Sequence, residues 1–260
     1  MSDERLLLVE HSRGVVTLAL NRPDAFNSLS LAVLTRLEEE LDGIANDPKA
    51  RVVVLTGKGK AFCAGHDLKE MGADLAFEPV RTLFTHCSRL MMKLARLPQP
   101  VIARVDGIAT AAGCQLVAAC DLAICSRESR FATSGVKYGL FCSTPMVALS
   151  RNLSRKHAME MLLTGEAVDA PTAREFGLVN RVVPPEYLDQ IVTKYAETLA
   201  SKSPLTLKTG KEAFYAQAEM DLSSAYEYAS QVMVENMMAR DAEEGIGAFI
   251  DKRRPEWTGE

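Results

Sequence analysis

The sequence contains three short, almost continuous runs of apolar residues, at 51–57 (RVVVLTG), 100–107 (PVIARVDG) and 121–126 (DLAICS). Runs of this length and composition are typical of strands that are buried on both faces of a parallel sheet. Helical periodicity follows the first two runs, over residues 80–96 and within residues 109–119. Alternation of buried strands with helices predicts an α/β fold with a parallel sheet.

The segment before these runs predicts a hairpin and a helix. Two stretches rich in β-forming residues flank the turn residues Ser12, Arg13 and Gly14, which indicates a β-hairpin. Apolar residues then recur at helical spacing between Ser30 and Ile44, and Ser30 is a suitable N-cap.

The character of the chain changes after about residue 185. Helical patterns fill the remainder, at residues 186–201, 205–219, 221–238 and 240–252. Met233, Met237 and Met238 recur at helical spacing, which is typical of a core or a subunit interface rather than of a cofactor site. We therefore divide the chain into a core, residues 1–185, and an all-helical region, residues 186–260.

Charge and hydropathy exclude several classes of function. The net charge is −4 and the basic residues form no long block, which argues against a nucleic-acid partner. No apolar run reaches about 18 residues, so we expect no membrane span. The N-terminus resembles neither a signal peptide nor a transit peptide, so the expected location is cytoplasmic, or an organelle matrix if a presequence has been removed.

The cysteines and histidines show no metal-binding or disulfide pattern. Cysteines without paired CxxC spacing, mostly among apolar residues, indicate buried free thiols in a reducing compartment: Cys63, Cys87, Cys114, Cys120, Cys125 and Cys142. The histidines lie far apart without HxxxH spacing: His11, His66, His86 and His157. The sequence predicts no metal site.

Two turns lead from a strand into a helix through small residues, at 61–70 (AFCAGHDLKE) and 109–119 (ATAAGCQLVAA). The first N–H groups of a helix have no partner inside the helix, and the helix dipole makes that end positive. Two such ends side by side would form an oxyanion hole, which stabilises negative charge on a carbonyl oxygen. Small residues at a helix start also serve close packing, and the spacing alone leaves both interpretations open. Neither turn carries a phosphate-binding glycine motif.

Five segments resemble, in order, the crotonase (enoyl-CoA hydratase/isomerase) superfamily. They are NRPDAFNSL (21–29), GKAFCAGHDLKEM (59–71), PVIARVDGIATAAGCQLVAACDLAI (100–124), LLTGEAVDAPTAREFGLVNRVVP (162–184) and EEGIGAFIDKRRPEW (243–257). The stretch FATSGVKYGLFCSTP (131–145) further resembles a branch of that superfamily, the enoyl-CoA hydratase domain-containing proteins. The resemblance covers nearly the whole chain.

The resemblance implies a fold, a substrate class and an assembly. The fold is an α/β, crotonase-like (ClpP/crotonase) spiral of ββα units, with the acyl-CoA site in residues 1–185. The helices of residues 186–260 would form a homotrimer or a dimer of trimers. The substrates would be acyl-CoA or enoyl-CoA thioesters, with coenzyme A as part of the substrate and no separate cofactor.

The resemblance also implies the roles of individual residues. The backbone N–H groups of His66 and Ala112 would form the oxyanion hole for a thioester enolate. Gln115 and Gly135 stand where hydratases of the family carry two glutamates. Glutamine can orient a water but cannot titrate, and glycine offers only space, so we expect hydration to be weak. Glutamates restored at both positions are expected to raise hydration if the pocket is otherwise intact.

Substrate-binding residues follow from the same motif positions. The resemblance implies that Phe249 and Lys252 reach coenzyme A across the trimer interface, where a cation would suit its phosphates. The complete expected set is Ala25, Phe26, Ser28, Ala64, His66, Asp67, Leu68, Ala112, Gly113, Phe249 and Lys252.

Other residues are candidates to replace the missing acids. Asp67, Glu70, His86 and His66 are the titratable groups near the motifs; of these, Asp67 suits a helix start, Glu70 a solvated surface and His86 a helix face. Three further side chains lie where they could line the pocket without a base to activate them: Cys142, Ser143 and Thr144.

Two functions remain open from the sequence. The first is an acyl-CoA thioester enzyme, most readily labelled an enoyl-CoA hydratase, with isomerase or hydrolase chemistry as alternatives. The second is a non-catalytic acyl-CoA-binding or regulatory protein of the same fold, which the loss of both glutamates favours.

Overall fold

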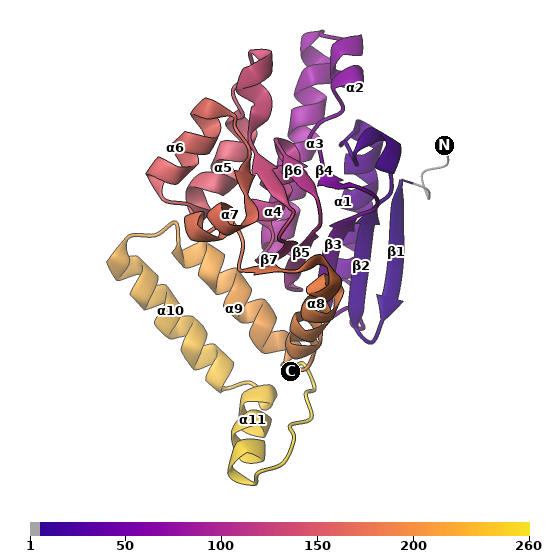
Figure 1. Ribbon diagram of the computed structural model, residues 1–260. Coiled ribbons are helices and arrows are strands. Elements are labelled where there is room, and N and C mark those ends of the chain that lie inside the picture. The colour runs from indigo at the N-terminus through magenta and orange to yellow at the C-terminus, as the bar shows by residue number, and fades with distance from the viewer. Residues whose placement is uncertain (1–5) are drawn as a thin grey trace.

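The computed structural model describes residues 6–260, and its centre is a six-stranded sheet (Figure 1). The first two strands pair antiparallel and all other neighbours pair parallel. In sheet order the strands are β1 (Leu7–Ser12), β2 (Val15–Leu20), β3 (Val52–Gly57), β5 (Val101–Val105), β7 (Leu122–Ser126) and β10 (Arg181–Val183). The expectation about an N-terminal leader rests partly on residues 1–5, which lie outside the described range.

The three predicted apolar strands, β3, β5 and β7, occupy the middle of this sheet. Val53, Ile102 and Ile124 are each fully buried. Strands paired on both edges and covered on both faces leave no place for polar side chains, so their apolar runs are continuous. The predicted hairpin is confirmed as β1 and β2, joined through Arg13 and Gly14, which both have positive φ.

A second, four-stranded sheet is built from short strands. In sheet order they are β4 (Ala61–Cys63), β6 (Ile108–Thr110), β8 (Arg130–Ala132) and β9 (Val168–Asp169). The strands β4, β6 and β8 follow β3, β5 and β7 along the chain, and a helix comes after each pair. This repetition confirms the expected spiral of ββα units.

Helices cover both faces of the six-stranded sheet. The larger core includes residues of α1, α3, α4 and α5 on one face, while α8 covers the other face through Leu188, Val192 and Ala196. The core helices are α1 (Leu31–Ala45), α2 (Leu68–Ala73), α3 (Phe77–Arg96), α4 (Ala112–Ala119), α5 (Ser143–Asn152), α6 (Arg155–Thr164), α7 (Ala170–Phe176) and α8 (Pro185–Ala200), with 3-10 helices η2 (Pro23–Ala25) and η3 (Ser134–Tyr138).

A local signal sets the start of α1. The Ser30 hydroxyl accepts a hydrogen bond from the Val33 N–H at 3.3 Å, which confirms Ser30 as the N-cap of α1. The helix expected over residues 80–96 begins earlier, at Phe77.

All six cysteines are buried free thiols. Within residues 6–260, no helix combines the length and apolarity that crossing a bilayer requires.

The last helices extend away from the sheets (Figure 1). They are α9 (Pro204–Gln217), α10 (Leu222–Met237) and α11 (Arg240–Ile250). Lys211 of α9 anchors them, since its ammonium donates to the Asp121 carboxylate at 2.6 Å and to the carbonyls of Leu94 and Gln99. Tyr215 donates to the same carboxylate at 2.9 Å.

The packing of α8 differs from the grouping expected for residues 186–260. This helix packs on the sheet with the core, so the compact body continues to Ala200, and the extended helical region begins with α9. The later helices expose several large apolar side chains: Phe214, Leu222, Tyr226, Met233, Val234, Met238, Phe249 and Ile250.

Candidate active site

The two turns singled out in the sequence lie in contact. We name them the Gly65 turn, residues 64–67, and the Ala111 turn, residues 110–113. A Cβ placed on Gly65 would lie 2.9 Å from the Ala111 Cβ and 3.2 Å from the Ala112 nitrogen. Gly65 also has a φ of 88°, which glycine adopts at low cost. The absent side chain therefore lets two helix starts meet at backbone distance.

Both turns present an amide without a partner. The Gly65 carbonyl and the Asp67 N–H pair with Leu29, which leaves the intervening His66 N–H without an acceptor among residues 6–260. Ala112 is the first residue of α4, so its N–H has no partner within the helix, and the described chain supplies none elsewhere. Two free N–H groups on adjacent turns match the composition of an oxyanion hole.

Ala111 holds a strained backbone conformation directly before one of these amides. Its φ is 50° and its ψ is −118°. Such a conformation costs a residue with a side chain about 1–3 kcal/mol. The hydrogen bond from its N–H to the Ala132 carbonyl, 2.9 Å long, and the contact with Gly65 hold it in place.

Both turns open onto one cavity of about 560 Å³, whose lining is predominantly apolar. The predicted residues that line it are Ser28, Ala64, His66, Leu68, Ala112, Gly135, Cys142, Ser143 and Thr144. The sequence analysis missed Met71, Phe84, Thr110, Ala111, Ser134, Tyr138, Leu140, Phe141 and Pro145 as lining residues. Of these, Phe84 could have been found, because it lies one helical turn before the buried Cys87 of α3.

Neither position of the expected family glutamates offers an acid or base. Gln115 is 3% exposed, lies outside the cavity lining, and its amide oxygen faces the Cys87 thiol with a sulfur–oxygen distance of 3.9 Å. Gly135 does line the cavity, but a Cβ there would lie 2.4 Å from the Leu140 carbonyl oxygen and 2.8 Å from the Cys142 sulfur. The expectation that glutamates at positions 115 and 135 would raise hydration depended on an open pocket. The backbone at Leu140 leaves no such space beside position 135.

Burial in the cavity favours the neutral forms of two side chains, His66 and Cys142. Burial lowers the pKa of His66 to about 4, and its ring lies edge-on to Phe84 with 5.0 Å between the centroids. Burial raises the pKa of the Cys142 thiol, although a hydrogen bond from the Gly135 backbone opposes the shift. At neutral pH the site therefore holds an uncharged imidazole and a protonated thiol.

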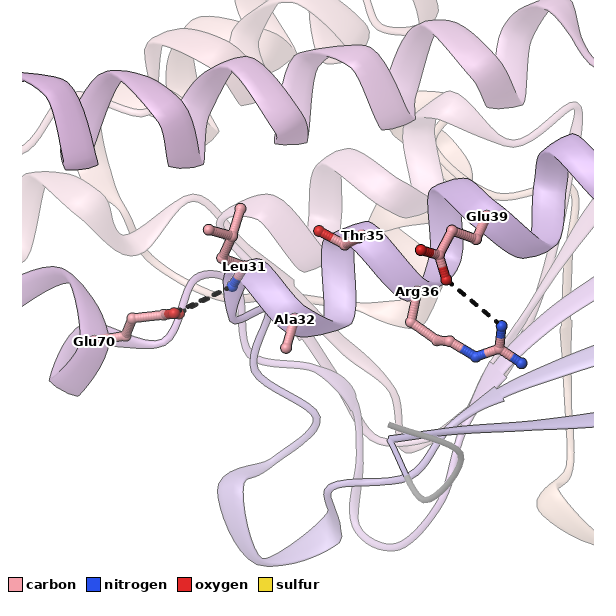
Figure 2. Close-up of a pocket in the computed structure, with 6 residues that line it drawn as sticks. All are labelled: Leu31, Ala32, Thr35, Arg36, Glu39 and Glu70. Carbon is pink, nitrogen blue, oxygen red and sulfur yellow. Dashed lines mark hydrogen bonds and ion pairs between the residues drawn. The ribbon is translucent and has the colours of Figure 1, made fainter. Parts of the chain in front are cut away.

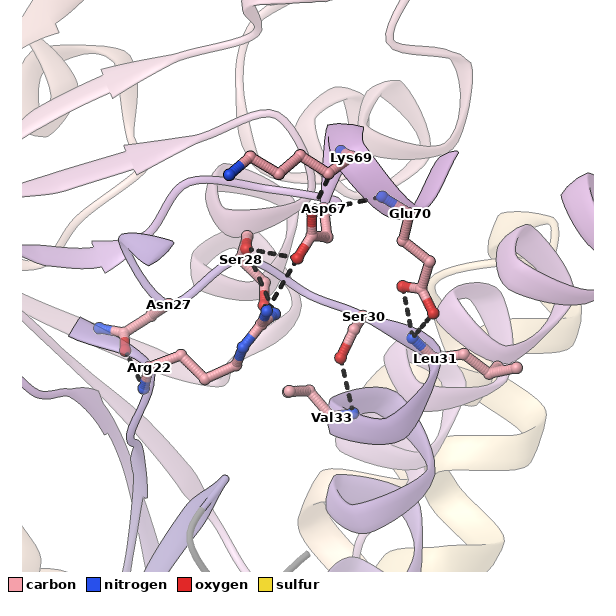
Figure 3. Close-up of polar contacts among 9 residues, drawn as sticks. All are labelled: Arg22, Asn27, Ser28, Ser30, Leu31, Val33, Asp67, Lys69 and Glu70. Carbon is pink, nitrogen blue, oxygen red and sulfur yellow. Dashed lines mark hydrogen bonds and ion pairs between the residues drawn. The ribbon is translucent and has the colours of Figure 1, made fainter. Parts of the chain in front are cut away.

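The nearby carboxylates are engaged outside the cavity (Figure 3). Asp67 caps α2 by accepting from the Lys69 N–H at 3.1 Å, and it pairs with the Arg22 guanidinium at 2.8 Å. Burial of Asp67 acts to raise its pKa, but the hydrogen bonds from Arg22 and the backbone outweigh it, and the pKa is lowered. Glu70 accepts from the Leu31 N–H at 3.0 Å, at the start of α1. Asp67 is thus the helix-start acid that its position predicted.

The remaining candidate base, His86, and a second hollow both lie apart from the cavity. His86 faces Glu38 of α1, with 3.1 Å from Nδ1 to the carboxylate, and does not line the cavity. A second hollow of about 390 Å³ at the start of α1 is lined by Leu31, Ala32, Thr35, Arg36, Glu39 and Glu70 (Figure 2). This hollow does not share a lining residue with the cavity of the two turns.

The remaining predicted substrate contacts divide by location. Gly113 is a packing position, because a Cβ there would lie 2.0 Å from the Cys63 carbonyl oxygen. Phe26 lies close to the site, since its carbonyl accepts from the Ala64 N–H, whereas its neighbour Ala25 ends η2 without lining the cavity. Two of the predicted residues lie at or just beyond the end of α11 and do not line the cavity of the same chain: Phe249 and Lys252. Figure 1 shows α11 at the opposite end of the molecule from α2.

Comparison with known proteins agrees with this architecture. A family described as enoyl-CoA hydratase/isomerase matches residues 10–260. The rat mitochondrial enoyl-CoA hydratase domain-containing protein 3 is 45% identical over 257 residues, which are 99% of this chain and 86% of the rat protein.

Solved structures give the same result. An enoyl-CoA hydratase from Mycobacterium smegmatis is 55% identical, with a TM-score of 0.95 over 97% of this chain and 98% of that chain. The human enoyl-CoA hydratase domain-containing protein 3 is 43% identical, with a TM-score of 0.95 over 97% of this chain and all of the human one (100%). Motifs, fold and similarity along the whole chain agree, and this protein belongs to the enoyl-CoA hydratase/isomerase family.

Proposed function

We propose that this protein binds acyl-CoA thioesters and stabilises their enolate form with the N–H groups of His66 and Ala112. The observation that carries this proposal is the contact between the Gly65 turn and the Ala111 turn at the wall of an apolar cavity. A thioester oxygen placed between two backbone donors gains most when it becomes negative, because the donors are already oriented and do not reorganise. Loss of one such donor in other enzymes costs about 3–4 kcal/mol of transition-state stabilisation.

The lining of the cavity supports a hydrocarbon acyl group. Its lining includes five large apolar side chains, those of Leu68, Met71, Phe84, Leu140 and Phe141. Apolar walls with a few convergent polar groups are typical of small-molecule sites. Coenzyme A is then part of the substrate, and the proposed reaction needs no separate cofactor.

Hydration is expected to be slow in this protein. Addition of water needs one group to take a proton from water and another to give one to Cα. Gln115 cannot titrate and lies outside the lining, and Gly135 has no side chain. The enolate step, with isomerase or hydrolase chemistry beyond it, is therefore better supported than efficient hydration.

A second candidate function is binding alone. The composition of the cavity lining favours it. Among the described residues that line the cavity, none carries a carboxylate or an ammonium group. In this case the protein would sequester acyl-CoA or act on related enzymes by association.

One pair of measurements separates the two functions. Calorimetry with butyryl-CoA measures binding, and incubation with butyryl-CoA in heavy water followed by mass spectrometry measures deuterium at Cα. Binding with exchange supports the enolate enzyme; binding without exchange supports the binding protein; absence of binding contradicts both. Loss of enoyl absorbance with crotonyl-CoA tests hydration, and turnover typical of a hydratase would contradict the roles given to Gln115 and Gly135.

The exposed apolar side chains of α10 and α11 support assembly as a homotrimer or a dimer of trimers. In that assembly Phe249 and Lys252 would reach the coenzyme A bound to a neighbouring protomer. Light scattering on the purified protein measures the mass, and a monomer at micromolar concentration would contradict the assembly. The mitochondrial label of the rat relative supports the organelle-matrix alternative for the location, which cell fractionation tests.

A further inference from the structure

Formation of an enolate requires a group that accepts the α-proton, and the cavity offers few. The family's usual acids are absent, and the titratable side chains that line the cavity are His66, Tyr138 and Cys142. The nearest carboxylate by sequence, Asp67, is held by Arg22 and by the start of α2. The base must therefore come from these three residues or from bulk solvent.

Two of the three are poor proton acceptors at neutral pH. Cys142 is a thiol whose pKa is raised by burial, so it stays protonated. Tyr138 is 64% exposed, and no carboxylate or lysine among the described lining residues would activate its hydroxyl. Serine and threonine hydroxyls in the lining have no adjacent base to activate them.

The imidazole of His66, in contrast, can accept a proton at neutral pH. Its Nε2 atom is buried without a hydrogen-bond partner, whereas its Nδ1 is neither buried in this way nor bonded to a described residue, so Nδ1 is the ring nitrogen that a ligand in the cavity can reach. A neutral imidazole always carries one bare nitrogen lone pair, so His66 retains a proton acceptor that the protein does not use. A buried polar atom without a partner is rare in native proteins and calls for an explanation.

We propose that the imidazole of His66 removes the α-proton of the bound thioester and returns it, in place of the family's glutamates. This inference rests on the enolate function proposed above. In the forward step the Cα–H bond breaks and the proton moves to Nδ1 of the imidazole, in the tautomer that carries its own proton on Nε2. The electron pair of that bond forms the Cα–C1 double bond, and the carbonyl electron pair moves to the oxygen held by the His66 and Ala112 amides. The reverse step delivers a proton to Cα and restores the neutral ring.

Two physical features make this assignment consistent. The base and one oxyanion donor belong to the same residue, so the carbonyl oxygen and the proton acceptor are positioned by one backbone segment. The pKa of the ring, lowered to about 4, is close to that of an ordinary glutamate carboxyl, so its strength as a base matches that of the groups it replaces. A developing enolate beside the ring would also stabilise the imidazolium form.

The test compares three variants by deuterium exchange at Cα of butyryl-CoA, with binding measured in parallel. His66→Gln and His66→Ala keep the backbone donor, so we expect affinity within about threefold of the parent and exchange reduced at least about 100-fold. Free imidazole added to His66→Ala should restore exchange in proportion to its concentration. The control is His157→Gln, because His157 stacks on Phe176 at 4.0 Å, outside the cavity, and should change neither quantity.

Each outcome decides between this proposal and the function on which it rests. Exchange that is lost in both variants, with binding kept and rescue by imidazole, supports His66 as the base. Exchange within tenfold of the parent in His66→Gln overturns this proposal and leaves the enolate function intact. Loss of exchange together with loss of binding and without rescue assigns His66 a structural role and also overturns it. A parent protein that binds but never exchanges overturns both.

Discussion

The two sides of the cavity offer a substrate different kinds of groups. The Gly65 turn and the Ala111 turn present backbone amides, which are available whatever the side chains are. The lining from η3 and residues 139–145 is where the resemblance to hydratases implies a carboxylate, and here it presents Gly135, with the carbonyl of Leu140 beside it. On the first side alanine occupies positions 111 and 112, and the amide of Ala112 remains without a partner among the described residues.

This difference shows that groups supplied by the backbone and groups supplied by a side chain respond differently to substitution. A function supplied by backbone amides survives substitution as long as the turns keep their contact. A function supplied by one side chain disappears with that side chain, and neighbouring chain fills its space. The following experiments test this contrast, beginning with the largest expected effect.

Substitution of Gly65 should damage the side built from the two turns most severely. In Gly65→Ala the new Cβ would meet the Ala111 Cβ at 2.9 Å and the Thr110 carbonyl at 3.0 Å, at a φ of 88°. We expect a loss of about 4 kcal/mol in the free energy of unfolding, measured by urea denaturation, and loss of butyryl-CoA binding. Gly72→Ala is the matched control, since nothing lies within 4 Å of its Cβ. An unchanged affinity in Gly65→Ala would contradict the close contact of the turns.

The second effect is a pH dependence that originates in His66. Its pKa is about 4 in the folded protein against 6.5 when unfolded, so the unfolded chain binds more protons between these values. Stability should therefore be full above pH 6.5 and fall as the pH drops towards 4, by at most about 3 kcal/mol.

The same pH series in His66→Gln isolates the contribution of the imidazole. Asp67, held by Arg22, titrates with a lowered pKa and remains charged over most of this range. Urea denaturation at pH 7 and at pH 4.5 should give a smaller difference for the variant than for the parent. An identical difference in both proteins would show that the ring is not buried in neutral form.

The third experiment tests the closed side of the cavity. Gln115→Glu combined with Gly135→Glu should lower stability by about 2 kcal/mol, because the Cβ at 135 would lie 2.4 Å from a backbone oxygen. Hydration of crotonyl-CoA should not increase, in contrast to the expectation from sequence. Gly43→Glu controls for an added acid, since position 43 has open space. A folded double variant with hydratase turnover would mean that residues 140–142 can move aside.

The smallest effect concerns the strain at Ala111. Glycine suits φ 50° and ψ −118° better than alanine does, so Ala111→Gly should relieve part of the strain. The greater freedom of glycine in the unfolded chain offsets some of this gain, which leaves a net stabilisation of about 1 kcal/mol. Thermal unfolding measures it, and a destabilised variant would contradict the strain.

The sequence predicted most of the fold because its strands carry local signals. The continuous apolar character of residues 51–57 is enough to predict a buried central strand. Ser30 predicts the start of a helix because its hydroxyl can cap the first turn. The packing of α8 on the sheet was not predicted, since an amphipathic helix does not specify which surface it covers.

The site was predicted only where it depends on motif position. The two turns could be identified from small residues before helices, but their contact depends on tertiary packing around Gly65. The closed space at Gly135 depends on the path of residues 139–142, which has no periodicity to read. The absence of a hydrogen-bond partner for the His66 ring is a property of its tertiary surroundings, which the identity of the residue alone does not determine.

The carbonyl of Leu140 beside Gly135 has a consequence for the mutational paths open to this protein. An acid at position 135 would need a single substitution in the amino-acid sequence, Gly135→Glu. The folded protein penalises that step, because residues 140–142 now occupy the volume the new side chain would need. A carboxylate at position 135 could therefore assist hydration only after residues 140–142 had been rebuilt around it.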